Sequence, residues 1–398
     1  MSLRGRSAIV GIGEFKPIRY TNGATTLGML AEVGRMAVAD AGFEFGQVDG
    51  LITESFSEAP FMAPSTVVEY LGLDVTFAEV VDLGGATGAG MVARAAMAID
   101  AGICETVLCL TAARREQRTT SGPKRSSSTG WAGRRTERNP YGEFEMPYGA
   151  IGANFGYAMI ANRYRHEYGV TPEQLAQIAV AQRYNACHNP EALFFGQPIT
   201  VEDVLNSPVI VDPLHLLEIV MPVAGAAAVL VTSAKLARKA KNPPAWVLGV
   251  GEHTTHRSLT YAPSLTDTAI KSSADQAFKM AGVRRKDIAV ASLYDCYTIT
   301  VLLTLEDAGF AKKGQGGQFV DDHNLQFDGD FPLNPHGGQL SFGQAGLAGG
   351  MSHVTEAARQ VMGKAPGRQV KKCDYAFVNG NGGIMSEQVS LIFGRDAK

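Results

Sequence analysis

Ala8–Glu14 reads AIVGIGE and Trp246–Glu252 reads WVLGVGE, and this pair of segments decides the fold. Each is a short apolar run that ends in Gly-x-Gly-Glu, as expected of a buried strand. About thirty residues later, Ala37–Phe43 (AVADAGF) and Ala277–Val283 (AFKMAGV) end two segments of helical period at Ala-Gly, which is a helix stop signal. The second copy follows the first at offsets of 238 and 240 residues, so the chain contains an internal repeat.

Each copy continues in the same order, with a strand, a glycine-rich turn, a helix and a closing strand. The first copy supplies Val48–Ile52, Leu83–Gly90, Met91–Ala101 and Thr106–Thr111, and the second supplies Ile288–Leu293, Asn334–Gly350, Ser352–Met362 and Tyr375–Val378. Strands that alternate with helices predict the α/β class, with mostly parallel sheets covered on both faces. Two copies predict two pseudo-symmetric βαβαβ halves, each with its own sheet.

A helical insertion interrupts the first half over residues 112–213, and a strand near Ala226–Thr232 rejoins it. We therefore expect an N-terminal half over residues 1–240, including the insertion, and a C-terminal half over residues 241–398. Within the insertion, the pattern predicts helices over Gly152–Tyr168 and Thr171–His188. Thr171 and Pro172 make a good N-cap and first turn for the second helix.

The insertion begins with a basic stretch, residues 114–138, that holds eight Arg or Lys and two Glu. One interpretation is a solvated surface loop. The other is a clamp for a phosphorylated ligand, because guanidinium and ammonium groups bind phosphate oxygens. The clamp would use Arg114, Arg115, Arg118, Lys124 and Arg125.

Composition excludes several classes of protein. The net charge is −3, which argues against a nucleic-acid-binding surface over the whole molecule. The longest apolar run, Ile219–Val231, is shorter than a membrane span and contains Pro222. The five cysteines include no Cys-x-x-Cys, so we expect neither a disulfide framework nor a zinc or other metal site, and we expect a cytoplasmic protein.

The layout of two such halves with an insertion after the first resembles the thiolase superfamily. The local sequence resembles one branch of this superfamily, the sterol-carrier-protein-type and bacterial lipid-transfer-like thiolases. The resemblance rests on Asn162–Asn189, Asp212–Leu214, Gly225–Ala228, Tyr294–Thr298, Asn334–Gly343 and Glu356–Gly363. It implies the five-layer α-β-α-β-α thiolase fold, and a coenzyme A thioester as substrate with no tightly bound cofactor.

The sequence departs from the family pattern at each of its usual catalytic positions. Gly85, in Gly84-Gly85-Ala86, stands where the family carries its nucleophilic cysteine. Gln344, in Gly343-Gln344-Ala345, stands where the family carries the histidine that activates that cysteine. The C-terminal loop Phe377–Gly383 contains no thiol. Acyl transfer through a cysteine is therefore not expected at this site.

The fourth family motif reads Tyr294-Asp295-Cys296 here, and it suggests different chemistry. A core tyrosine is one interpretation of Tyr294. The other is a phenol that exchanges a proton with a substrate hydroxyl, as in the steroid side-chain aldolases that this branch resembles. In such a retro-aldol cleavage of a β-hydroxyacyl-CoA, Asp295 and His336 are the further candidates for proton transfer. Asn379, or Asn381 two residues later, would donate a hydrogen bond to the enolate oxygen. The plainer interpretation is that both are turn residues.

Two other functions stay open at this point. The chain could be an acyltransferase or thiolase with a relocated nucleophile, for which Cys296 is the best-placed cysteine. It could also be a non-catalytic subunit that binds acyl-CoA or lipid. From the resemblance we expect a homodimer and a small partner protein with an OB fold and a zinc ribbon. We expect His353 to be structural. His253 and His256 lie in a loop that borders the coenzyme A site in relatives, and we expect them to be surface histidines.

Overall fold

The structure is a computed structural model that describes residues 3–117 and 139–397. Its main feature is a nine-stranded sheet in the order β3-β2-β4-β7-β1-β8-β11-β10-β9. The N-terminal strands are β1 Ser7–Glu14, β2 Gly50–Thr53, β3 Phe77–Val80, β4 Thr106–Ala113 and β7 Gly225–Ser233. The C-terminal strands are β8 Ala245–Thr254, β9 Val290–Leu293, β10 Tyr375–Gly382 and β11 Glu387–Gly394.

The prediction of two separate sheets was wrong in one respect. β1 and β8 pair at Ala8 with Trp246 and at Ile9 with Ala245, and this short antiparallel contact joins the two halves into one sheet. The two repeated segments that open the halves are thus neighbours in space.

The prediction of mostly parallel strands was also wrong. Five of the eight strand pairings are antiparallel, and three are parallel. β7 lies between β4 and β1, and β11 lies between β10 and β8, each against the direction of its neighbours. The reversed strand inside each half makes two antiparallel pairings, so the two halves contribute four of them. The β1–β8 pairing is the fifth.

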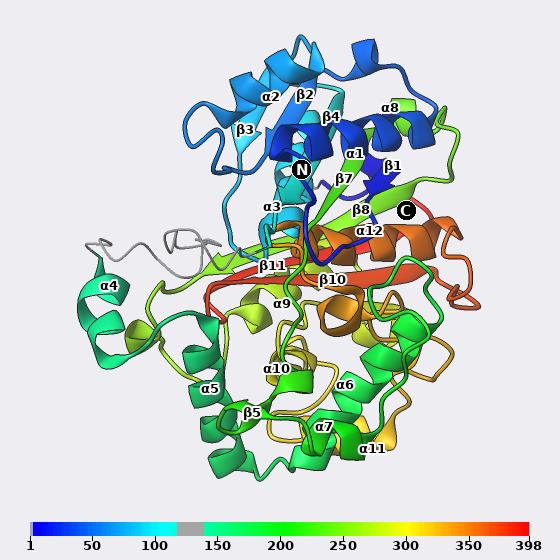
Figure 1. The fold of residues 1–398 in the computed structure, drawn as a ribbon. Coiled ribbons are helices and arrows are strands. Elements are labelled where there is room, and N and C mark those ends of the chain that lie inside the picture. Colours follow the sequence, from blue (N-terminus) through cyan, green and yellow to red (C-terminus); the bar gives the residue numbers. More distant parts are fainter. Residues whose placement is uncertain (1–2, 118–138, 398) are drawn as a thin grey trace.

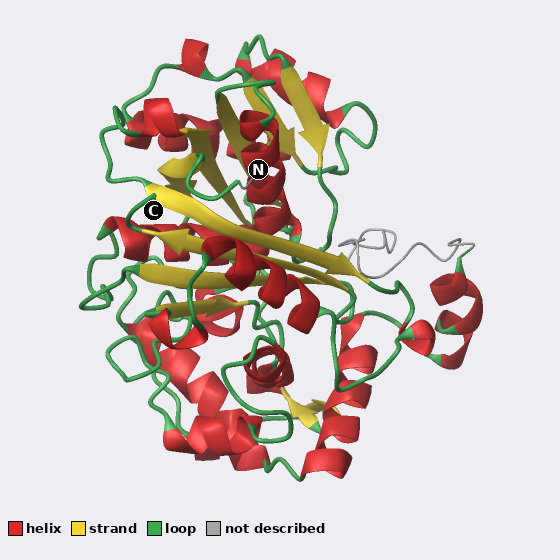
Figure 2. Cartoon of the chain, turned by 180° about the vertical axis from the view of Figure 1, so that it is seen from behind, coloured by secondary structure: helices red, strands yellow, loops and turns green. Residues whose placement is uncertain are grey.

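Helices cover the sheet in the predicted five layers (Figure 1; Figure 2). α3 Thr87–Asp100 and α12 Ala348–Met362 pack on each other and on strands of both halves, and so form the middle layer. α1 Thr26–Ala41 covers β1, β4 and β7, while α9 Ile270–Ala281 covers β8 and β11. Short helices complete the outer layers: α2 Ala63–Leu71, α8 Ala234–Ala237, α10 Thr298–Asp307 and α11 Gly316–Asp322.

The repeat is confirmed at its helix ends. α1 ends at Ala41, with Gly42 as C-cap at φ 74°, and α9 ends at Ala281, with Gly282 as C-cap at φ 65°. Both caps lie in the left-handed region that favours glycine. The two Ala-Gly signals in the sequence therefore mark equivalent turns.

The insertion lies between β4 and β7 and includes α4 Pro140–Phe144, α5 Ala153–Tyr168, α6 Pro172–Cys187, α7 Val201–Leu205 and the hairpin β5 Val209–Val211 and β6 Leu214–His215. α5 and α6 confirm the two predicted helices, and Thr171 caps α6 in a capping box with Gln174. α6 packs on α10 and α11, so the insertion covers the C-terminal half, whereas α4 projects from the body (Figure 1).

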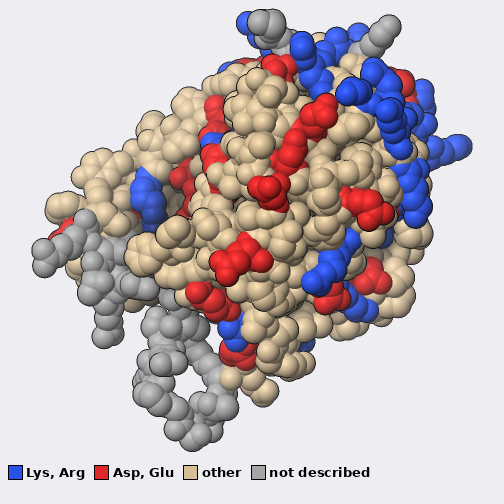
Figure 3. All heavy atoms as spheres, turned by 90° about the horizontal axis from the view of Figure 1, so that it is seen from above, with Lys and Arg blue, Asp and Glu red and all other residues tan. Residues whose placement is uncertain are grey.

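Charge is unevenly spread on the face of the N-terminal half shown in Figure 3, where basic side chains gather along one edge and acidic ones lie over the rest. Within residues 3–117 and 139–397, no helix has both the length and the apolar character needed to cross a membrane.

Candidate active site

Glycines let three distant segments meet between the two halves of the molecule. Gly84 has φ 54°, and a Cβ there would lie 3.1 Å from the Cα of Gly382. A Cβ on Gly350, in α12, would lie 2.1 Å from the carbonyl oxygen of Gly85. The turn after β3, the end of β10 and the start of α12 thus approach more closely than any side chain allows.

Gly85 and Tyr294 occupy the same place in this site. A Cβ on Gly85 would lie 2.2 Å from Cζ of Tyr294 and 2.4 Å from the carbonyl oxygen of Asn381. Real Cβ atoms do not approach other atoms so closely. The phenol ring therefore fills the space that a nucleophilic side chain at residue 85 would need.

Tyr294 is buried, and its backbone N–H donates to the carbonyl oxygen of Asn379 at 3.0 Å. Burial raises the pKa of its phenol, and the nearby Cys296 thiol raises this pKa further. Hydrogen bonds with the side chains of Gln344 and Gln339 act in the opposite direction without cancelling the rise. The phenol is therefore protonated near neutral pH.

Gln344 lies beside Tyr294. Its side chain contacts the Tyr294 phenol, and its amide nitrogen also lies 3.4 Å from the carbonyl oxygen of Gly346. An amide does not act as a base near neutral pH, but it does donate and accept hydrogen bonds. Gln344 can therefore orient the phenol, and its place as the counterpart of the family's histidine stays a prediction.

Asp295 contacts a loop rather than Tyr294. Its carboxylate accepts hydrogen bonds from the backbone N–H groups of Gln339 at 2.7 Å and Leu340 at 3.3 Å. The same carboxylate lies 3.2 Å from Nε2 of His353, and both side chains are fully buried. Asp295 thus holds the one-turn π-helix Gly338–Phe342, which carries Gln339 to the phenol.

His353 lies near Tyr294. Its ring lies 5.9 Å from that of Tyr294, and its Nδ1 lies 3.2 Å from the hydroxyl of Ser292. With the Asp295 contact, these interactions make it a buried structural partner of the active-site loop.

His336 lies behind His353, with the two ring centroids 5.1 Å apart, and packs on Phe342. Burial lowers its pKa well below the usual value, and the nearby His353 and Arg368 lower it further. Both ring nitrogens are buried, and neither has a hydrogen-bond partner among the residues that the structure describes. The imidazole is therefore uncharged at neutral pH, and its role in proton transfer stays a prediction.

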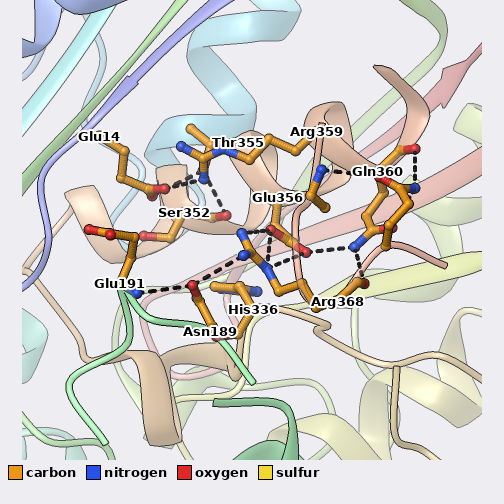
Figure 4. A network of polar contacts seen from close by, with 12 residues as sticks. Glu14, Asn189, Glu191, His336, Ser352, Thr355, Glu356, Arg359, Gln360 and Arg368 are labelled. Carbon is orange, nitrogen blue, oxygen red and sulfur yellow. Dashed lines mark hydrogen bonds and ion pairs between the residues drawn. The ribbon is translucent and has the colours of Figure 1, made fainter. Parts of the chain in front are cut away.

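A buried ion pair supports the segment that carries His336 (Figure 4). The guanidinium of Arg368 binds the carboxylate of Glu356, with the shortest contact at 2.8 Å, and also donates to Asn189. The amide of Asn189 in turn donates to the carbonyl oxygen of His336 at 3.0 Å. This network fixes the backbone of His336 and leaves its ring free of polar contacts.

Asn379 and Asn381 lie within β10, which continues to Gly382, so the prediction of a glycine-rich loop was wrong. Pairing with β11 extends the strand through Gly380 and Gly382. The amide nitrogen of Asn379 already lies 3.3 Å from the side-chain oxygen of Gln388, and within residues 3–117 and 139–397 its own side-chain oxygen has no partner. Its role as donor to an enolate stays a prediction.

The structure offers no activated cysteine among the buried thiols. Burial raises the pKa of Cys296 to about 12, that of Cys373 to about 12 and that of Cys104 to about 11. It also raises the pKa of Cys109. Because the thiolate is the nucleophile, these protonated thiols are poorly suited to acyl transfer.

Arg114 and Arg115 contact protein groups. Arg114 donates to Glu58 at 2.7 Å and also pairs with Glu116, while Arg115 donates to the carbonyl oxygen of Pro222 at 2.6 Å. Neither lines the cavity described next. The other members of the predicted clamp, Arg118, Lys124 and Arg125, lie outside the described residues.

A cavity of about 600 Å³ opens beside the end of β10. Ile160, Leu259, Ile384 and Met385 give it apolar walls, and Lys271, Lys279, Asp267 and Asp275 give it a charged rim. His253 and His256 also line it, so the loop that the sequence linked with coenzyme A does border a cavity. A space of this size is within the range of small-molecule sites.

Sequence reasoning missed Tyr157, Gln339 and Gln388. Tyr157 comes from α5, more than two hundred residues before the β10 groups that it contacts. Gln388 faces Asn381 across the β10–β11 ladder. No local motif distinguishes these residues, because only the fold brings them to the site.

Together, the fold and this site define a thiolase-fold protein with glycine at residue 85, against the ring of Tyr294. The family described as "Thiolase C-terminal domain-like" matches residues 251–395. The steroid side-chain-cleaving aldolase of Thermomonospora curvata is 36% identical over 371 residues, which cover 91% of each chain. The 17-hydroxy-3-oxo-4-pregnene-20-carboxyl-CoA lyase of Mycobacterium tuberculosis is 33% identical over 91% of this chain and 92% of its own.

The solved structure of the Ltp2–ChsH2(DUF35) aldolase superposes with a TM-score of 0.85 at 32% identity, over 98% of both chains. The chain therefore belongs to the thiolase superfamily, in the lipid-transfer-like branch that includes steroid side-chain-cleaving aldolases.

Proposed function

We propose that the protein is an acyl-CoA lyase that cleaves the Cα–Cβ bond of a β-hydroxyacyl-CoA by a retro-aldol reaction. The observation that carries this proposal is the phenol ring of Tyr294 in the space beside Gly85. With that arrangement residue 85 cannot form a covalent acyl-enzyme, and a phenol that carries a proton lies there instead. Retro-aldol cleavage needs proton transfer, and it needs no covalent acyl-enzyme.

A neutral phenol can carry out both proton transfers of the proposed reaction. The β-hydroxyl proton moves to the oxygen of Tyr294 while the phenol's own proton moves to the enolate. The electron pair of the Cα–Cβ bond becomes the enolate, and the β-carbon becomes a ketone. Gln344 and Gln339 hold the phenol during this exchange, and the products are a ketone and a shortened acyl-CoA.

The relatives support a lipid or steroid acyl chain. One is named for cleaving a steroid side chain, and the other for a hydroxylated steroid carboxyl-CoA. We infer that coenzyme A lies in the 600 Å³ cavity, with its phosphates near Lys271 and Lys279. On this basis Lys279→Ala raises KM severalfold at unchanged kcat, whereas Lys239→Ala, in the turn after α8, changes neither.

We further propose a cytoplasmic homodimer that works with a small partner protein. All five cysteines are free, as in a reducing compartment. β3 is an edge strand, and the exposed Phe61, Met62 and Tyr70 lie on or next to α2, which packs on it. The similar solved structure holds ChsH2(DUF35) with the aldolase, which supports a partner here as well. Light scattering after chromatography measures the oligomeric state.

The test is product analysis with a β-hydroxyacyl-CoA that carries a tertiary alcohol. We expect one ketone and one shortened acyl-CoA per substrate, and at least a hundredfold lower kcat for Tyr294→Phe, since loss of general acid–base catalysis costs about 10²- to 10⁴-fold. Full activity of Tyr294→Phe would overturn the mechanism. Tight acyl-CoA binding without cleavage would support the non-catalytic alternative instead.

A further inference from the structure

Tyr157 ends a directed chain of buried amide hydrogen bonds beside the candidate active site. Asn379 donates to Gln388 at 3.3 Å, Gln388 donates to Asn381 at 2.8 Å, and Asn381 donates to the Tyr157 hydroxyl at 2.9 Å. The hydroxyl then donates to the carbonyl oxygen of Gly383 at 3.0 Å. Every side chain in this chain is at most 2% exposed.

The chain of hydrogen bonds fixes a wall of the active site. The carbonyl oxygen of Asn381 lies 2.4 Å from the place of a Cβ on Gly85, directly beside the Tyr294 ring. Tyr157 holds this strand end at two points, through the Asn381 side chain and the Gly383 backbone. Losing its hydroxyl would leave two buried polar groups without their partner.

α5 is built to approach this strand end. A Cβ on Gly156 would lie 2.3 Å from the side chain of Ile384, so glycine lets the helix contact the β10–β11 turn. The Tyr157 ring stacks on Tyr297 at 4.3 Å, which fixes its orientation. The insertion thus contributes one side chain, from a helix, to the site between the two halves.

We propose that Tyr157 is a positioning residue for the reaction at Tyr294, and that it acts by holding Asn381 and Gly383 against Gly85. This inference rests on the proposed lyase function and extends it to the insertion. Burial raises the pKa of Tyr157, so the phenol stays neutral and can donate and accept at once. Phenylalanine can do neither.

The test compares Tyr157→Phe with Tyr297→Phe. Both variants remove one hydroxyl from a buried, stacked tyrosine pair, but the Tyr297 hydroxyl donates to Asn154, within α5. We expect Tyr157→Phe to lower kcat about tenfold at nearly unchanged KM. Tyr297→Phe should stay within about twofold of the wild type. Equal kcat values for the two variants would overturn the proposal.

A double-mutant cycle tests the route of the effect. If Tyr157 acts through Asn381, adding Tyr157→Phe to Asn381→Ala lowers kcat little further. Fully additive effects would contradict this route.

Amide hydrogen exchange gives a readout that needs no substrate. Tyr157→Phe should speed exchange in residues 379–386, and Tyr297→Phe should not. Unchanged exchange would overturn the inference even if the protein cleaves no β-hydroxyacyl-CoA, and a wild type without cleavage would count against the proposed function alone.

Discussion

At the scale of single residues, the central relation is between Gly85 and Tyr294. The ring and a side chain at residue 85 exclude each other, because their atoms would lie 2.2 Å apart. The family resemblance predicts that Gly85 stands where a nucleophile is missing. The structure adds that the Tyr294 ring fills the space that a side chain at residue 85 would need.

Gly85→Ala tests this relation. The added Cβ must displace the phenol, so we expect at least a hundredfold loss of kcat, as for Tyr294→Phe. Overpacking of this kind also costs about 1–3 kcal/mol in the free energy of unfolding. Gly46→Ala is the control, because a Cβ there meets no atom within 4 Å. Wild-type turnover by Gly85→Ala would contradict the assigned geometry.

The pH dependence of the reaction tests the protonation state of Tyr294. Its raised pKa keeps the phenol protonated through pH 10, and the proposed exchange uses that form. We therefore expect kcat to change by less than about threefold between pH 7.5 and 10. A tenfold rise for each pH unit would show instead that the reaction requires a phenolate base. Profiles measured with saturating substrate distinguish the two.

Residue roles were predicted from the sequence only in part. Gly85, Gln344 and Tyr294 follow from motif positions, and the structure brings all three together. Asp295 and His336 also come from motifs, yet their side chains contact the supporting loop and the core behind it. Neighbouring residues in extended backbone point to opposite sides, so a motif locates a site without telling which side chain enters it.

At the scale of elements, the ends of β2 and β4 share a buried carboxyl group. Glu54 follows β2, and its carboxyl accepts from the backbone N–H of Ala112 in β4 at 2.7 Å. Burial raises its pKa to about 8, and the charge of Asp82 adds to the rise. The folded protein therefore holds a proton on Glu54 that the unfolded chain releases above pH 4.5.

This proton makes stability fall as pH rises. Between pH 4.5 and 8 the folded state binds the additional proton, so the free energy of unfolding declines with pH and then levels off. Glu54→Gln should remove the decline, with a gain of a few kcal/mol at pH 8 and none below pH 4.5. Urea unfolding at several pH values measures it, and a variant less stable than the wild type at pH 8 would refute it.

Glu58→Gln is a control of opposite sign. Partial burial raises the pKa of Glu58, but hydrogen bonds from Arg114, Thr26 and Ser57 outweigh it and lower the pKa to about 2. Its stabilisation is present above pH 4.5 and is lost as pH falls toward 2. This variant should therefore be less stable than the wild type at pH 8.

Elements with strong local signals were predicted well. Caps and periodicity located α1, α5, α6 and α9 to within a few residues where a boundary was predicted. β10 was predicted too short, because its last residues, Asn379–Gly382, have the composition of a turn. Hydrogen bonds to β11 outweigh that local preference, and no local pattern contains them.

At the scale of the whole molecule, the repeat predicts two similar halves, and the family resemblance implies the thiolase fold. In the structure, α3 and α12 of the two halves pack on each other. Strand direction could not be predicted, since the reversed strands β7 and β11 depend on long-range pairing. Several glycines lie where the halves meet. Gly84, Gly85, Gly350 and Gly382 each lie where a Cβ would strike backbone or ring atoms of another segment.

The central claim is that carbon–carbon cleavage occurs without an acyl-enzyme. The dependence of the cleavage rate on free coenzyme A tests this claim most directly. Thiolase cleavage consumes a second coenzyme A, whereas retro-aldol cleavage consumes none. The measurement is the initial rate of ketone release from a tertiary β-hydroxyacyl-CoA, with and without added coenzyme A. We predict full cleavage without it and no stimulation when it is added. Cleavage that begins only after coenzyme A is supplied would contradict the proposed mechanism.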